Sequence, residues 1–221
     1  MAPLTPPIRS GGRRSLKTDF RLVTPEDLRE TLADPGLNPV VLEAHFSSLD
    51  HPLDPDQPPK HHLPGAIQIH PSYLEAGTNH EKYYPFYECP DDGNVLHGRE
   101  LIHLLQQIGI ALDSPVVIYG TEPDGTMAAA RLAWGLAYAG VKTVSVLDGG
   151  IDAWVAQGGT TESSVKTVRD TLQETTPETQ DWTAWNLRPD YLATTAEVRE
   201  IVRGHNAATH KLVDVRRRGE W

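Results

Sequence analysis

The single cysteine of the chain, Cys89, is the most obvious candidate nucleophile, and its surroundings oppose that role. It stands beside Glu88, Asp91 and Asp92, with no adjacent lysine or arginine. Neighbouring carboxylates disfavour the thiolate, which is the reactive form of a cysteine. We therefore interpret Cys89 as a loop thiol rather than as a displaced nucleophile. A single cysteine also excludes an internal disulfide and a zinc site built wholly from thiolates.

The ten histidines form no metal-binding pattern. His61 and His62 are adjacent, so their side chains diverge in an extended segment. His97 and His103 lie six positions apart, which is not the spacing of one helix face. We expect His62 to fix its own loop through hydrogen bonds, and Asp148 to be a turn or cap residue rather than a catalytic acid. The sequence has no serine-hydrolase, phosphate-binding or dinucleotide-binding motif.

A glycine-bounded loop from Gly120 to Gly125 follows the continuous apolar run Val116–Tyr119. Such a run is typical of a central parallel strand, and the loop leads into an apolar helix. Glu122 and Asp124 give this loop two carboxylates and no cation. Because like charges repel, the loop disfavours an anionic ligand.

Apolar patterns predict the elements that position these residues. Helices are expected to start at Pro25 and to cover 101–108, 127–139 and 151–155, and strands to cover 40–42, 66–69, 116–119 and 143–147. Alternating strands and helices indicate an α/β domain with a parallel sheet.

Composition restricts the function classes. The formal net charge is −10, which disfavours binding to a nucleic-acid backbone or to an anionic membrane. Residues 1–20 are interpreted as a disordered basic tail, without the apolar stretch of a secretory signal. Its prolines and glycines oppose the amphipathic helix of a mitochondrial transit peptide. A cytoplasmic protein is therefore expected, with the mitochondrion as the alternative.

The end of the chain repeats its beginning. Residues 159–189 are rich in Thr, Ser, Glu and Gln and are interpreted as a linker held down by tryptophans. Beyond it, Thr194 and Glu197 form a helix-capping pattern, and a strand is expected at 212–215. At a constant offset, the early residues Thr24, Arg29, Glu30 and Leu32 are matched by Thr194, Arg199, Glu200 and Val202. A repeat of this length indicates duplicated domains. Residues 190–221 would then be the incomplete start of a second domain.

Three motifs together resemble the rhodanese superfamily, in particular the N-terminal half of tandem-domain sulfurtransferases. They are His62–Ala66, the strand, loop and helix around Gly120, and Leu147–Trp154. The resemblance implies an α/β fold with a central parallel sheet covered by helices on both faces, over residues 21–158. It also implies sulfane-sulfur transfer from thiosulfate or 3-mercaptopyruvate to cyanide or a thiol, with no cofactor and no metal.

The resemblance places the family's nucleophilic cysteine directly after the central strand, where a helix N-terminus stabilises the thiolate. Gly120 occupies that position here, so we expect the domain to be catalytically silent. The expected partner is a C-terminal catalytic domain, which would bring the small anionic sulfur donor.

Two features stay open. Arg216, Arg217 and Arg218 are weak candidates for binding the donor, although pairing with Asp214 or other carboxylates is favoured. The aromatic loop 83–87 is either a packed lid or a ligand platform. The alternative to the enzyme is a non-enzymatic rhodanese-like binding or regulatory module; a weak anion sensor at the Gly120 loop is opposed by its acids.

Overall fold

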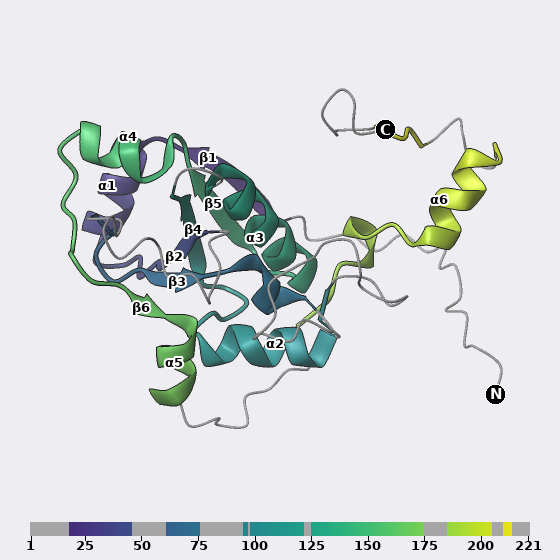
Figure 1. The fold of residues 1–221 in the computed structure, drawn as a ribbon, viewed down its shortest axis with the longest axis horizontal. Coiled ribbons are helices and arrows are strands. Elements are labelled where there is room, and N and C mark those ends of the chain that lie inside the picture. Colours follow the sequence, from purple (N-terminus) through teal and green to yellow (C-terminus); the bar gives the residue numbers. More distant parts are fainter. Residues whose placement is uncertain are drawn as a thin grey trace, which may run out of the picture.

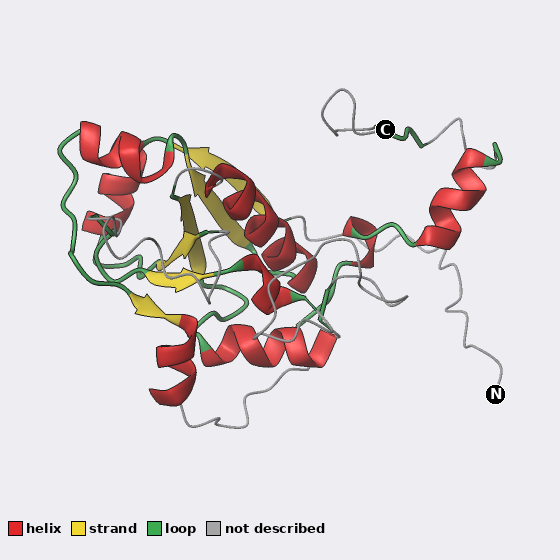
Figure 2. Ribbon diagram, in the orientation of Figure 1, coloured by secondary structure: helices red, strands yellow, loops and turns green. Residues whose placement is uncertain are grey.

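The computed structural model describes residues 18–45, 61–75, 95–96, 98–121, 125–174, 185–204 and 210–213. Its centre is a six-stranded sheet with the order β1-β5-β4-β2-β3-β6, and every strand pair is parallel (Figures 1 and 2). The strands are β1 (Asp19–Val23), β2 (Val40–Ala44), β3 (Ile67–Ile69), β4 (Pro115–Gly120), β5 (Thr143–Leu147) and β6 (Lys166–Thr167).

Helices cover both faces of this sheet, as the resemblance implied. The helices in the described part of the chain are α1 (Pro25–Ala33), α2 (Gly98–Gln107), α3 (Gly125–Ala139), α4 (Gly150–Ala156), α5 (Val168–Glu174) and α6 (Thr195–Val202), with short 3₁₀ helices η1 (Pro71–Leu74) and η3 (Pro189–Tyr191). Of these, α6 lies away from the sheet (Figure 1). Side chains alternate along a strand, so Ile118 of β4 enters one apolar cluster and Val117 the other. The fold class is therefore confirmed.

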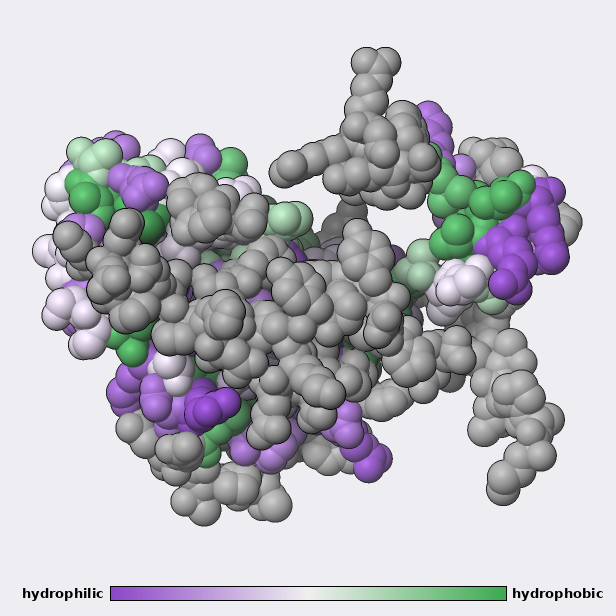
Figure 3. Space-filling view, viewed as in Figure 1, coloured by the Kyte–Doolittle hydropathy of each residue, from purple (hydrophilic) through white to green (hydrophobic). Residues whose placement is uncertain are grey.

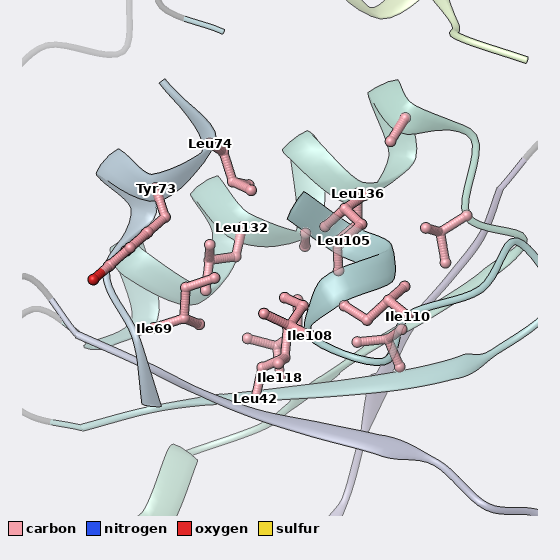
Figure 4. Packing of buried hydrophobic residues seen from close by; sticks show 14 of the residues in the cluster. Leu42, Ile69, Tyr73, Leu74, Leu105, Ile108, Ile110, Ile118, Leu132 and Leu136 are labelled. Atoms are coloured by element: carbon pink, nitrogen blue, oxygen red, sulfur yellow. The ribbon is translucent and has the colours of Figure 1, made fainter. Parts of the chain in front are cut away.

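The larger cluster lies between the sheet and helices α2, α3 and α5. Leu105 of α2 and Leu132 of α3 meet Leu42 and Ile118 from the central strands, and all four are almost fully buried (Figure 4). On the opposite face, Leu28 of α1 packs with α4 over the sheet. Burial on both faces explains why the central strands are continuous apolar runs.

Two parts of the sheet depart from the expectations. Strand β1 was not predicted, and it begins inside the segment interpreted as a tail. The expected linker 159–189 contains β6, which pairs with β3, and α5, whose Val168 is buried in the core. Both strands lie at edges of the sheet. An edge strand is short and half exposed, so its sequence carries a weak apolar signal.

Helix α6 has the same start as α1 but a different environment. Thr24 and Thr194 are both extended N-cap residues, and each makes a capping box with the acid three positions later. However, α6 buries none of its residues, whereas α1 buries Leu28. Leu212 and Val213 are exposed and not in a strand, and the remainder of the strand expected at 212–215 lies outside the described residues.

Candidate functional site

The carboxyl ends of the central strands define the candidate site. Since all strands are parallel, the segments that follow β2, β4 and β5 meet along one edge of the sheet. In α/β folds with open sheets, this edge is where ligands bind. Gly120 is the last residue of β4, so the strand extends one residue beyond the expected 116–119, and Gly125 is the first residue of α3. Residues 122–124, with Glu122 and Asp124, lie outside the described residues.

Backbone fills the space around Gly120. A Cβ atom placed on Gly120 would lie 2.1 Å from the carbonyl carbon of Gly125, and one on Gly125 would lie 2.5 Å from the carbonyl carbon of Gly120. The turn after β5 also packs against Gly120, because a Cβ on Gly150 would lie 2.6 Å from the Gly120 carbonyl oxygen. Atoms this close are backbone and cannot rotate away. Any side chain at this position, cysteine included, would therefore force this backbone to shift.

This crowding is what the sequence did not predict. The missing sulfur at Gly120 follows directly from the residue type, but the contacts with Gly125 and Gly150 depend on the fold. Gly150 also has a positive φ of 56°, which favours glycine. The signal for this crowding in the sequence was the glycine at each of positions 120, 125 and 150. These glycines lie at the ends of loops that a parallel sheet brings to one edge.

A buried polar cluster includes Tyr119, the residue immediately before Gly120. The carboxylate of Glu43, at 0% exposure, is its centre. His62 Nδ1 lies 2.6 Å from Glu43 Oε2, the Tyr119 hydroxyl donates to the same oxygen, and Gln68 Nε2 donates to Oε1 over 2.8 Å. The backbone N–H of Leu63 in turn donates to the Tyr119 hydroxyl at 3.2 Å.

This cluster satisfies a carboxylate that burial would otherwise destabilise strongly. Burial raises the pKa of Tyr119 far above its usual value, and the negative Glu43 adds to the effect. The phenol therefore remains protonated and serves as a permanent donor. Tyr119 immediately precedes Gly120, so the cluster also fixes the strand end that leads to the candidate site.

His62 and Asp148 have the structural roles expected from the sequence. The backbone N–H and C=O of His62 pair with the backbone of Glu162 at 3.0 and 2.8 Å, so both the ring and the main chain hold the loop. Asp148 lies in the turn after β5, and its N–H donates to the Val23 carbonyl at 2.9 Å. Glu43, which the sequence analysis left without a role, joins the His62 loop to Gln68 of β3 and Tyr119 of β4.

A second polar group lies near the N-terminal half of α3. Arg131 pairs with the buried Glu75 at 3.0 Å, and its guanidinium lies 4.6 Å from the centre of the Trp134 ring. His45 and His70, which follow β2 and β3, are both buried, and their ring centres are 5.7 Å apart. None of these four polar side chains was selected from the sequence, because only the fold brings residues after separate strands together.

Several candidates from the sequence lie outside the described residues: Cys89, the aromatic loop 83–87, and Arg216, Arg217 and Arg218. Across the described part of the chain, no three His, Cys, Asp or Glu side chains gather as a metal site would require. Among the helices in that same part, none combines the length and apolar character needed to cross a bilayer.

These features match a known family. The model of the rhodanese-like domain matches residues 25–157, and the chain belongs to this family. It is related to thiosulfate sulfurtransferases.

Named relatives show the extent of the likeness. The thiosulfate sulfurtransferase of Bos taurus is 30% identical over 100 residues, covering 43% of this chain and 34% of the relative. That of Corynebacterium glutamicum is 29% identical over 137 residues, covering 62% and 38%. The chain thus spans little more than a third of the length of these relatives.

Solved structures agree on the fold. The 3-mercaptopyruvate sulfotransferase SseA from Escherichia coli superposes with a TM-score of 0.57 at 18% identity, over 83% of this chain and 62% of that one. Wild-type EanB gives a TM-score of 0.58 at 26% identity, over 83% and 41%. In both cases the likeness extends over more of the chain than the family match does.

Proposed function

We propose that this chain is the N-terminal portion of a two-domain sulfurtransferase, and that its first domain is non-catalytic. The enzyme would move sulfane sulfur from thiosulfate or 3-mercaptopyruvate to a thiophilic acceptor such as cyanide or a thiol. The carrying observation is the backbone contact at Gly120, which leaves no room for a nucleophile at the strand end where the family places one.

The reaction assigns the chemistry to a cysteine of the second domain. With thiosulfate as donor, the thiolate attacks the outer sulfur, the sulfur–sulfur bond of thiosulfate breaks, and sulfite leaves with the bonding electrons. Cyanide then attacks the outer sulfur of the persulfide, and thiocyanate leaves while the thiolate is restored. The first domain would stabilise the second and supply one side of the cleft between them.

The match of Thr24, Arg29, Glu30 and Leu32 with Thr194, Arg199, Glu200 and Val202 at a constant offset supports a second domain. Thr194 and Glu197 reproduce the hydrogen bonds of Thr24 and Asp27, at 3.2 Å from each acid's N–H to the threonine hydroxyl. The relatives also contain much more chain than the part that aligns here. A non-enzymatic binding module is the alternative, and the closed site at Gly120 suits it equally well. The repeat favours the enzyme, because a binding module has no need for the opening of a second copy.

The test is a thiosulfate:cyanide assay on the purified 221-residue chain. We expect no thiocyanate above the rate of a buffer blank, and the same result for Cys89→Ser. Thiocyanate formation that is lost in Cys89→Ser would contradict the proposal, because it would make Cys89 the nucleophile.

The coding sequence after codon 221 tests the other half of the proposal. We expect it to encode a further strand that ends in cysteine, roughly a domain's length of about 100–150 residues downstream. An in-frame stop codon at that point would favour the binding module instead.

A further inference from the structure

An arginine–aromatic ladder runs along the side of α3. The guanidinium of Arg131 lies over the Trp134 ring, and the Trp134 and Tyr138 rings stack with centres 5.8 Å apart and an interplanar angle of 16°. We call Arg131, Trp134 and Tyr138 the α3 ladder; its side chains share one side of a rigid helix.

The segment 186–192 is bonded to this ladder by main-chain groups. The indole N–H of Trp134 donates to the Tyr191 carbonyl at 3.0 Å, and the backbone N–H of Arg188 donates to the Tyr138 carbonyl at 2.8 Å. The Tyr191 ring meets the ring of Phe20 on β1 edge to face, with centres 6.5 Å apart. The segment is therefore held by both a helix and the edge strand.

Arg188 locks the segment in its turn. Only 8% of its side chain is exposed, and the guanidinium bonds both carboxylate oxygens of Asp190 at 3.2 and 3.1 Å. It also lies 5.0 Å from the centre of the Tyr191 ring. A planar fork that pairs with a carboxylate and stacks on an aromatic ring is a preorganised contact that lysine cannot reproduce.

Helix α6 follows immediately, and none of its residues is fully buried. Its cap residue Thr194 comes three positions after Tyr191, and Val202 is 69% exposed. Figure 3 shows apolar surface gathered over the α6 region, beyond the body of the first domain. The direction in which α6 leaves the domain is therefore set by the anchored segment 186–192.

We propose that the α3 ladder is the seat that fixes the second rhodanese-type unit relative to the first, with Trp134 and Arg188 as its positioning residues. The identity of that unit rests on the proposed function. A cleft shared by two units requires a constant angle between them. The segment 186–192 lies immediately before α6 and is hydrogen-bonded to α3, so it would fix that angle. The α3 ladder binds the segment 186–192 directly, and the second unit of the same protein, of which α6 is the opening helix, follows that segment.

Two matched tryptophans provide the test in the 221-residue chain. Trp134 and Trp154 each donate an indole N–H to a backbone carbonyl, the first to Tyr191 at 3.0 Å and the second to Thr160 at 2.8 Å. Trp134→Phe and Trp154→Phe each remove one such bond and keep an aromatic ring. The measurements are amide hydrogen exchange for each residue and ¹⁵N relaxation of α6.

We expect Trp134→Phe to speed exchange at the amides of Tyr191 and Leu192 about tenfold, the effect of losing one hydrogen bond. Core amides such as that of Leu132 should not change. Relaxation should show α6 tumbling with the domain in the wild type and moving more freely in this variant. Trp154→Phe should instead speed exchange only around residues 157–160. Arg188→Lys keeps the charge but removes the fork, and it should resemble Trp134→Phe even if the latter folds poorly.

Two results would overturn the proposal: α6 tumbling independently in the wild type, or equal effects of the two tryptophan variants on residues 188–192. These results are separable from the proposed function. A stop codon after residue 221 would defeat the two-domain enzyme and leave the exchange pattern unchanged. An unanchored α6 would defeat the seat while leaving the assay for thiocyanate unaffected.

Discussion

Helices α1 and α6 begin in nearly the same way and end in opposite environments. Both start with a threonine cap in extended conformation, at φ −77° for Thr24 and −76° for Thr194. The fourth residue after each cap is Leu28, which is 1% exposed, and Val198, which is only half-buried. The comparison teaches that local sequence forms the helix, whereas the sheet beneath it determines whether the helix contributes to a core.

The largest expected effect concerns the buried cluster around Glu43 in the first domain. Glu43→Ala should lower the free energy of unfolding by about 3–5 kcal/mol, because the donors of His62, Tyr119 and Gln68 lose their common acceptor. Urea denaturation measures this change. Glu30→Ala, on the exposed side of α1, is the control and should change little. Equal effects of the two variants would show that the cluster is not essential to the first unit.

The next effect compares the two helices directly. Leu28→Ala should cost about 2–5 kcal/mol, because it opens a cavity between α1 and the sheet. Val198→Ala, at the matching position of α6, should change stability by less than about 0.5 kcal/mol. Thermal or urea unfolding of both variants gives the comparison. A large loss from Val198→Ala would show that α6 already has a core to pack against.

A smaller effect tests whether the backbone around Gly120 tolerates a cysteine at the end of β4. Gly120→Cys should lower stability by about 1–3 kcal/mol, as overpacking does, and should produce no thiocyanate. Gly36→Cys is a control in an exposed turn, where the nearest atom is a side-chain oxygen of Asp34 at 3.2 Å. A stable and active Gly120→Cys enzyme would refute the closed site.

The smallest effect is the acid response of the two caps. Hydrogen bonds to the Thr24 hydroxyl and backbone lower the pKa of Asp27, and bonds to the Thr194 backbone and hydroxyl lower that of Glu197. A lowered folded-state pKa stabilises the cap above the unfolded value, about 3.9 for Asp and 4.3 for Glu, and this stabilisation is lost as pH falls through the folded value.

Both helices should therefore weaken below about pH 4. Because α6 buries none of its residues, it should fray first, while α1 remains held by Leu28. Amide chemical shifts of the two helices, followed from pH 6 to pH 2, measure the order of loss. Simultaneous loss would mean that burial does not distinguish them.

The regular elements follow from local patterns to a large degree. The apolar run of β4, the leucine spacing of α2 and the caps at Thr24 and Thr194 each predict their element correctly, because each signal lies within a few residues. Strands β1 and β6 were missed because they pair with β5 and β3, which are distant in sequence. Such strands are stabilised by pairing rather than by their own propensity.

The candidate site divides in the same way. The absence of sulfur after the central strand, and the anchoring role of His62, could be predicted from residue types and motifs. The Glu43 cluster and the α3 ladder could not, because their members come from separate elements: Glu43, His62 and Tyr119 in one case, Trp134 and Tyr191 in the other.

By itself, the sequence determined that this chain builds a rhodanese-like sheet and that glycine follows the apolar run Val116–Tyr119, since both depend on residue types within short stretches. Only the tertiary structure decided that Gly125 and Gly150 close that position, and that α3 holds the segment leading to α6. The reason is physical: contacts between backbones exist only after the strands have paired and brought distant loops to one edge.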